Sequence, residues 1–185
     1  GMDLAATDVS AVTAKSADFT AIVITGQDRE GFIYVLDLLQ FQTDKRSIFY
    51  DNIKKLRDYW GFREIHVEAE SGFKIALEGI RESVREDGST LIVKGTNAPR
   101  GMAKAERHAS IAEPRYINKT VKHKKDGLFR ELEDQLVQAR PAHDDLLDAL
   151  CICMDHSRSP VERTINRSTK SSNVVVANSR FGGRI

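Results

Sequence analysis

Three carboxylates stand within five residues of one another, at Asp144, Asp145 and Asp148, at the head of an apolar run. The preceding Pro141 suits the start of a helix, so we expect a helix from about this residue to about His156. At 100° per residue, the three acids share one side of that helix and its apolar residues face the other. Clustered carboxylates are hard oxygen donors that suit Mg²⁺ or Mn²⁺. The run therefore predicts a metal site, and a solvated acidic helix face is the alternative.

Further carboxylates lie where such a site could use them. Residues 63–69 are predicted to form a strand, with Glu68 on its polar face near the carboxyl end. Glu70 falls on the same face and is the alternate to Glu68. Asp3 stands almost at the start of the chain, beside small residues. Because parallel sheets bind ligands at the carboxyl ends of their strands, Glu68 is a second candidate ligand, and an acid merely exposed at a strand end is the alternative.

The rest of the chain supplies elements that could position these acids. Two runs rich in β-branched and aromatic residues, at 19–25 and 32–38, predict an antiparallel hairpin. Apolar spacing predicts four more helices and one more short strand: helices over 47–60, 73–86, 101–111 and 128–137, and a strand over 91–94. Residues 114–125 are expected to be more extended. Strands that alternate with helices indicate an α/β fold with a largely parallel sheet and helices on its faces.

Basic residues gather in two segments outside the acidic run. The first segment contains Arg115, Lys119, Lys122, Lys124 and Lys125, interleaved with apolar residues. The second, residues 157–185, has six basic residues and one acid; its net charge of +5 within a chain of +1 leaves −4 for residues 1–156. Such segments are usually solvated surface, but beside a carboxylate cluster they can neutralise the phosphates of a nucleic acid.

Length and composition exclude several classes of protein. A chain of 185 residues, 41% of them hydrophobic, predicts one domain, which we place at 3–156, with 157–185 as a basic C-terminal arm. No apolar run reaches the ~18 residues of a membrane helix. Cys151 and Cys153 form neither a disulfide framework nor a zinc site, which favours a reducing cytoplasm. The phosphate-binding loop of P-loop ATPases is absent, so this chain is not expected to hydrolyse ATP.

The motifs follow one another in a particular order. Asp3 and its small neighbours come first, followed by segments 17–23 and 31–37, and then by the acidic strand end Val-Glu-Ala-Glu-Ser-Gly. A basic stretch over 104–114 and 121–123 precedes the run His-Asp-Asp-Leu-Leu-Asp-Ala-Leu at 143–150. This order resembles the nuclease domain of phage terminase large subunits. The resemblance covers about residues 3–156, and the run at 143–150 is its most specific part.

The resemblance implies a ribonuclease H-like fold, with a mixed five-stranded sheet flanked by helices and a first strand that is short or truncated. It implies a divalent-metal-dependent endodeoxyribonuclease that cuts concatemeric DNA during viral genome packaging, with two Mg²⁺ or Mn²⁺ ions. The family's acids carry over as follows: Asp3, Glu68 and Asp148 as catalytic residues and metal ligands, Asp145 as a further ligand, and Asp144 and Glu70 as alternates. The carboxyl carbons of the three catalytic acids are expected within about 10 Å of one another. Because clustered carboxylates repel, replacing Asp148 by alanine is expected to leave the metal-free fold intact or slightly more stable.

The resemblance also implies partners and a setting. Double-stranded DNA is the expected substrate, and an ATPase motor domain, the small terminase subunit or the portal are expected partners, in the cytoplasm of a bacterial host that carries a phage or prophage. Asp3 is almost the first residue and no motor domain precedes it, so either upstream sequence was removed or the chain starts late. The alternatives are another ribonuclease H-like nuclease, such as a resolvase or transposase core, and a non-catalytic remnant that binds DNA or a packaging partner.

Overall fold

The computed structural model describes residues 2–3, 19–43, 45–68, 74–97, 101–138 and 141–158. Its elements are, in chain order, β1 (Met2–Asp3), β2 (Thr20–Gln27), β3 (Ile33–Phe41), α1 (Arg46–Trp60), β4 (Glu64–Glu68), α2 (Lys74–Glu86), β5 (Ile92–Thr96), α3 (Lys104–Ile117), β6 (Val121–Lys122), α4 (Leu128–Val137) and α5 (Asp145–His156). Glu70 and nearly all of the predicted basic arm lie outside the described residues. No helix in the described part of the chain has the length and apolar character needed to cross a bilayer.

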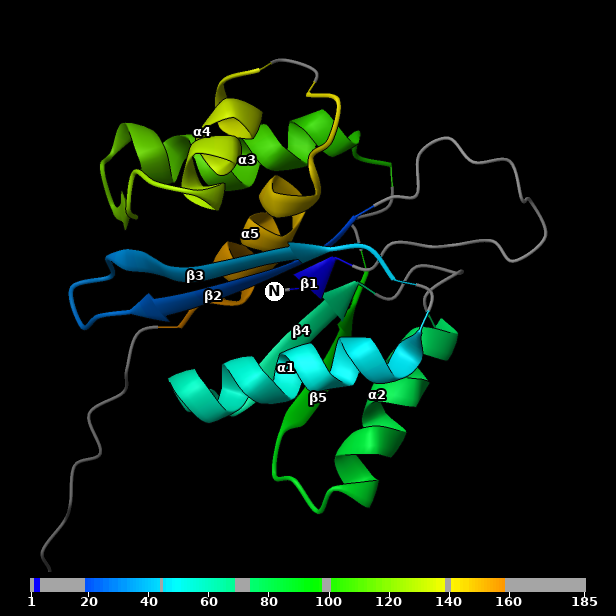
Figure 1. The fold of residues 1–185 in the computed structure, drawn as a ribbon. Coiled ribbons are helices and arrows are strands. Elements are labelled where there is room, and N and C mark those ends of the chain that lie inside the picture. The colour runs from blue at the N-terminus through cyan, green and yellow to red at the C-terminus, as the bar shows by residue number, and fades with distance from the viewer. Residues whose placement is uncertain are drawn as a thin grey trace, which may run out of the picture.

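A six-stranded mixed sheet in the order β5-β4-β1-β2-β3-β6 forms the centre of the molecule (Figure 1). Strands β1, β2 and β3 pair antiparallel, which confirms the predicted hairpin, whereas β1, β4 and β5 pair parallel. The sheet has one strand more than the five expected, because the short β6 pairs with the start of β3 at the sheet edge. The strands that carry Asp3 and Glu68 are thus direct neighbours.

The sheet separates two hydrophobic cores. Alternate residues of a strand point to opposite faces, so Ala21 and Val23 of β2 face one core while Ile22 and Ile24 face the other. Helices α3, α4 and α5 cover the first face, and α1 and α2 cover the second (Figure 1). The candidate site lies on the face of α3, α4 and α5.

Helix α3 is longer than the sequence predicted. It continues through Pro114 to Ile117, so the expectation of extended backbone from residue 114 is wrong for its first four residues. Tertiary packing outweighs the local signal here, because Ala112 is buried and Tyr116 packs against the same core. The Asn118 backbone N–H donates to the Pro114 carbonyl at 3.0 Å and closes the last turn. The additional turn carries the chain to β6 at the sheet edge.

Candidate metal centre

Asp148 is a charged residue in the interior of the protein. It lies in the first turn of α5, a helix in which every residue from 146 to 154 is buried. The Asp148 side chain is only 2% exposed. The helix starts at Asp145, and the Asp148 N–H donates to the Asp144 carbonyl at 2.8 Å. The alternative of a solvated acidic face is therefore wrong for Asp148, because α3 packs over that side of α5. Asp144 and Asp145 remain partly exposed.

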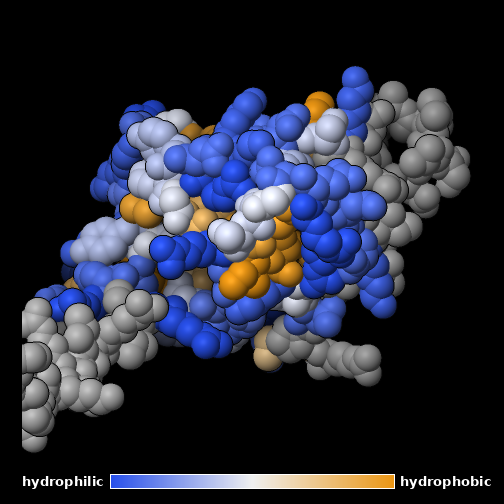
Figure 2. Space-filling view, turned by 90° about the horizontal axis from the view of Figure 1, so that it is seen from below, coloured by the Kyte–Doolittle hydropathy of each residue, from blue (hydrophilic) through white to orange (hydrophobic). Residues whose placement is uncertain are grey.

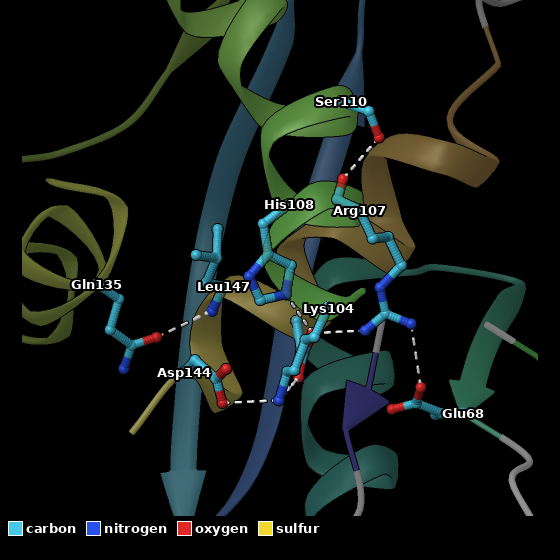
Figure 3. Close-up of polar contacts among 9 residues, drawn as sticks. Glu68, Lys104, Arg107, His108, Ser110, Gln135, Asp144 and Leu147 are labelled. Carbon is cyan, nitrogen blue, oxygen red and sulfur yellow. Dashed lines mark hydrogen bonds and ion pairs between the residues drawn. The ribbon is translucent and has the colours of Figure 1, made fainter. Parts of the chain in front are cut away.

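Three basic side chains of α3 contact the Asp148 carboxylate, and Figure 3 labels them as Lys104, Arg107 and His108. Arg107 Nη2 donates to Asp148 Oδ1 at 2.6 Å, and His108 Nε2 lies 2.5 Å from the same oxygen. Lys104 Nζ forms an ion pair with Asp148 Oδ2 and a 2.7 Å hydrogen bond with Asp144 Oδ1. The spacing of three and four residues brings the three side chains onto one face of α3. We use the name Asp148 network for Asp148 and its neighbours Lys104, Arg107, His108, Asp144 and Glu68.

Glu68 joins the network through Arg107. It is the last residue of β4, and its neighbours Ile65 and Val67 point into the core on the other face, as the predicted alternation requires. Arg107 Nη1 lies 3.2 Å from Glu68 Oε1. One guanidinium therefore connects the carboxyl end of β4 with the first turn of α5, because Arg107 pairs with both Glu68, as Figure 3 shows, and Asp148.

The backbone of Asp3 lies next to this position. Met2 pairs with Val67 in the parallel ladder and Asp3 pairs with Ala21, so the backbone of Asp3 is level with Glu68. The side chain of Asp3 is outside the described part of the structure. The prediction that its carboxylate completes the site therefore stays a prediction.

Asp145 differs from Asp148 in its surroundings. Burial raises the pKa of Asp145, and its Oδ2 atom is buried with no hydrogen-bond partner among the described residues. Burial also favours the neutral form of Asp148, but hydrogen bonds and charge from His108 and Lys104 outweigh it and hold the pKa of Asp148 below its ordinary value. Two carboxylates three positions apart thus lie in environments that shift their pKa values in opposite directions.

The two cations of the network are held in their charged forms. Burial lowers the pKa of Lys104, but hydrogen bonds to Asp144 and Asp148 outweigh it, so the pKa is raised well above the ordinary lysine value. The Arg107 pKa is likewise raised, because attraction to Asp148 and Glu68 exceeds the effect of burial. Glu68, Asp144 and Asp148 are therefore each paired with a cationic side chain of α3.

One group of side chains fits a divalent ion. His108, Asp144 and Asp148 each offer one ligand atom, and these atoms lie within 4.8 Å of one another. Carboxylate and imidazole donors together suit Mn²⁺ and related transition metals, while the carboxylates also suit Mg²⁺. Lys104 Nζ contacts two of these three residues, so an ion would have to replace its ammonium group. The lysine can leave, since its side chain is 48% exposed.

Residues 1–156 match the sequence model of a family described as the terminase RNaseH-like domain. The chain belongs to this family. Membership establishes the ribonuclease H-like fold and the class of nuclease domain that the motif order indicated, and the match ends at the last residue of α5. Among solved structures, Thermus thermophilus RuvC is similar at 15% identity and a TM-score of 0.45, over 75% of this chain and 85% of that one. No curated protein matches the sequence.

The lysines predicted to bind DNA lie far from the carboxylates of this terminase-family domain. Lys119 follows the C-terminal end of α3, whereas Lys104 begins it, and 1.5 Å of rise per residue separates the two by about 20 Å. Lys122, Lys124 and Lys125 follow at and after β6, where Lys122 Nζ lies 4.4 Å from the centre of the Phe32 ring. The Arg115 guanidinium is half-buried and donates to the carbonyls of residues 111 and 154.

A groove of about 1,100 Å³ separates α3 from α4. It begins at Lys104 and reaches Ile117, which is largely exposed, and Gln135 of α4 lines its wall. The Gln135 side chain is buried, and its Oε1 accepts the N–H of Leu147 in α5 at 3.0 Å (Figure 3). Its Nε2 has no hydrogen-bond partner within the part of the chain that is described. Gln135 of α4 thus satisfies a backbone N–H in the first turn of α5. Asp144, at the N-cap position of α5, makes no such side-chain hydrogen bond.

Sequence reasoning assigned no role to Lys104, Arg107 or His108, although it recognised the stretch 104–114 as basic. The available signal was their spacing, which brings all three to one face of the predicted helix. The spacing does not tell which neighbouring element this helix face contacts. The acids that pair with it, Asp144 and Asp148, come much later in the chain, so the pairing depends on how α3 crosses α5. The contacts of His108 and Arg107 with Asp148 could therefore be recognised only in the folded structure.

Proposed function

We propose that this domain is a divalent-metal-dependent endonuclease that cuts double-stranded DNA, as the terminase resemblance implies. The observation that carries the proposal is the convergence of Glu68, Asp144, Asp148 and His108 from three different elements at the carboxyl end of β4. Burying charged groups is costly unless they are paired or bind metal. An acid without a role would be expected at the surface, whereas the side chain of Asp148 is buried.

The residues divide into metal ligands and positioning groups. Asp148, Asp144 and His108 would hold a divalent ion, with Asp145 as a further ligand, and the ion would polarise the scissile phosphate and lower the pKa of the attacking water. Glu68, with Asp3 beside it, would hold a second ion in the two-ion form of this chemistry. Arg107 stands between Glu68 and Asp148 as a positioning group.

A plasmid assay tests the proposal directly. The full chain should convert supercoiled plasmid into nicked and linear forms with Mn²⁺ or Mg²⁺ but not with a chelator. Asp148→Asn and Glu68→Gln should each abolish cleavage. Asp87→Asn is the matched control, since Asp87 also pairs with cations but lies near α1, and it should cut like the wild type. Folded wild-type protein that cuts no DNA with either metal would refute the nuclease assignment.

DNA binding is proposed to use the lysines around β6, namely Lys119, Lys122, Lys124 and Lys125, together with Arg115 and the basic arm 157–185. Phosphate contacts are independent of sequence, so binding should not depend on base composition. Replacing Lys124 and Lys125 by glutamine should flatten the dependence of log affinity on log salt by about 2, since each phosphate contact contributes roughly 0.9. The same change at Lys54 and Lys55 of α1 is the control, and equal slopes for all proteins would exclude this surface.

The biological setting follows from the family resemblance. We propose that the substrate is concatemeric phage DNA in the cytoplasm of a bacterial host, and that the domain works with an ATPase motor, a small terminase subunit or a portal. Pull-down of a phage motor domain by the full chain would support this setting. Preferential cutting of four-way junctions over linear duplex would instead favour a resolvase.

A non-catalytic role is the second candidate, and one observation favours it. Lys104 and Arg107 already neutralise Asp148, so the network is complete without metal. A remnant that only binds DNA would keep the salt-dependent affinity and show no metal-dependent cleavage. Thermal melting with and without Mn²⁺ separates the two functions, because only a metal site predicts a shift.

A further inference from the structure

The groove between α3 and α4 has apolar walls that no described residue covers. Along α3, Ala105, Ala109 and Ala112 follow one another at spacings of four and three residues, so they form one stripe of small side chains in the groove. Ile117 of α3 and Val137 of α4 also line it, and they are 69% and 80% exposed. Large exposed apolar side chains that gather at one groove indicate a surface that another segment covers.

Two polar atoms of the groove residues also lack partners. Tyr116 Oη and Gln135 Nε2 are buried, and neither has a hydrogen-bond partner among the described residues. Both residues line the groove. Because buried polar atoms of native proteins are almost always paired, these two atoms indicate that a further neighbour belongs at this surface.

We propose that the groove binds the chain's own segment 174–177, which lies in the basic arm outside the described residues. The segment reads Val-Val-Val-Ala and is the longest apolar run of the arm. A short run of this kind matches a groove whose own walls are alanine, leucine and valine side chains. The inference goes beyond the nuclease assignment and does not depend on it, because it concerns how the chain packs on itself.

The arm begins close enough to the groove to reach it. Helix α5 ends at His156, and its last turns lie beside α3, where Arg115 Nη2 donates to the Met154 carbonyl at 3.4 Å. Sixteen residues separate Arg158 from Val174 and can span up to about 53 Å, at roughly 3.3 Å each. Helix α3, which forms one wall of the groove, is only about 21 Å long. The linker therefore reaches any part of the groove.

Charge also favours this occupant. One acid stands on each wall of the groove, Glu113 in α3 and Glu133 in α4, whereas residues 157–185 carry a net charge of +5. Lys170 precedes the apolar segment and Arg180 follows it, so a docked segment would bring cations close to both acids. The lysine at the other end of the groove, Lys104, is already paired with Asp144.

The covalent link makes a weak contact sufficient. A segment joined to its site by a flexible linker meets it at an effective concentration of about a millimolar, without any loss of free translation. Four apolar residues would bind poorly as a separate peptide, but they can stay docked as part of the same chain. The basic residues of the arm lie outside the apolar segment and stay available for DNA.

Photochemical cross-linking of the full chain tests the inference. Cys151 and Cys153 are buried, so a maleimide reagent should label only a cysteine introduced at the surface. Val175→Cys, labelled with a benzophenone maleimide and irradiated, should form bonds to residues 105–117 and 133–138 of the same chain. Peptide mass spectrometry locates these bonds, and a mixture of isotope-labelled and unlabelled chains distinguishes bonds within one chain from bonds between two.

Two matched substitutions make the cross-link specific. Ile117→Asp places a charge in the groove and should abolish the bonds to α3 and α4. Tyr59→Asp makes the same change at a 78% exposed side chain of α1, on the other face of the sheet, and should leave the bonds unchanged. Bonds that persist in Ile117→Asp, bonds scattered over the surface, or no bonds at all would overturn the inference. Bonds only between chains would show that the groove binds the arm of a second copy instead.

Hydrogen exchange provides a second measurement that needs no label. In the full chain, Val175→Asp should release the segment, and backbone amides of α3 and α4 beside the groove should then exchange faster than in the wild type. Ser168→Asp adds the same charge to the arm outside the apolar segment and should exchange like the wild type. Equal exchange in all three proteins would also reject docking of the segment.

Discussion

Two carboxylates of this protein have nearly the same partners and very different environments. Asp87, just after α2, accepts hydrogen bonds from Tyr50 Oη and Lys54 Nζ, each at 2.8 Å, and lies 3.7 Å from Arg57 Nη1. Asp148 likewise has one ring side chain, one lysine and one arginine around it. The side chain of Asp87, however, is 26% exposed against 2% for Asp148. Composition alone would not distinguish the two networks.

The positions of the two networks explain the difference. The Asp87 network joins α1 to the end of α2 on the second face of the sheet, where water screens its charges. Figure 2 views the molecule from that side, where hydrophilic residues cover most of the surface and the largest hydrophobic area lies near the centre. The Asp148 network lies between a strand end and two helices. A desolvated cluster of charges seldom adds net stability, so we interpret its burial as a functional feature.

The largest expected difference is in stability. Replacing Asp148 by alanine leaves Arg107 buried beside only one carboxylate, so we expect a loss of about 3–5 kcal/mol in the free energy of unfolding. The sequence alone predicted no loss, because it showed the neighbouring acids but not the three basic partners. Asp87→Ala should cost much less. Urea unfolding of both variants decides this, and an Asp148→Ala protein as stable as the wild type would restore the original expectation.

Metal should stabilise one network and not the other. At a Mn²⁺ concentration of 100 times the dissociation constant, binding to the folded state adds about 2.7 kcal/mol of stability. We expect this increase in the wild type and in Asp87→Asn, and its loss in His108→Ala, which removes one proposed ligand. Thermal melting with Mn²⁺ and with a chelator measures it. A shift that survives His108→Ala would place the ion elsewhere.

Removing the competing lysine should strengthen metal binding. Lys104→Gln frees two carboxylates from an ammonium group, so the Mn²⁺ affinity should rise by roughly tenfold, equivalent to about 1.4 kcal/mol. Lys54→Gln makes the same change in the Asp87 network and should leave the affinity unaltered. Calorimetric titration compares them. Weaker binding by Lys104→Gln would mean that the lysine orients the carboxylates for the metal.

The smallest effect concerns acid stability. Hydrogen bonds from Lys54 and Tyr50 hold the pKa of Asp87 below its ordinary value. Its stabilisation is therefore fully present above the unfolded pKa of about 3.9 and is lost as the pH falls through the lower, folded pKa. Asp87→Asn should have a slightly shallower decline in unfolding free energy below about pH 4, measured in low salt. Identical pH profiles would show that water already screens this network.

The sequence predicted what local periodicity can encode. A helix ending at about His156, the hairpin and the polar face of β4 with Glu68 were all predicted from spacing, and the structure confirms them, although α5 begins at Asp145 rather than near Pro141. The burial of Asp148 was not predicted, because a helical projection gives an angle around one helix and no information about its neighbours. The continuation of α3 through Pro114 was missed for the same reason, since the core contacts of its last turn come from other elements.

Gln135 has a consequence that reaches beyond helix capping. Its amide oxygen accepts the Leu147 N–H, its Nε2 is buried with no hydrogen-bond partner among the described residues, and the residue lines the groove between α3 and α4. A molecule that fills the groove beside Gln135 would therefore contact the residue that satisfies an N–H in the first turn of α5. Since Asp148 follows Leu147 directly, we expect a molecule bound in the groove to change hydrogen exchange at the Leu147 amide, next to the acid. Slower exchange on filling the groove would indicate tightening, and unchanged exchange would mean that the two sites are independent.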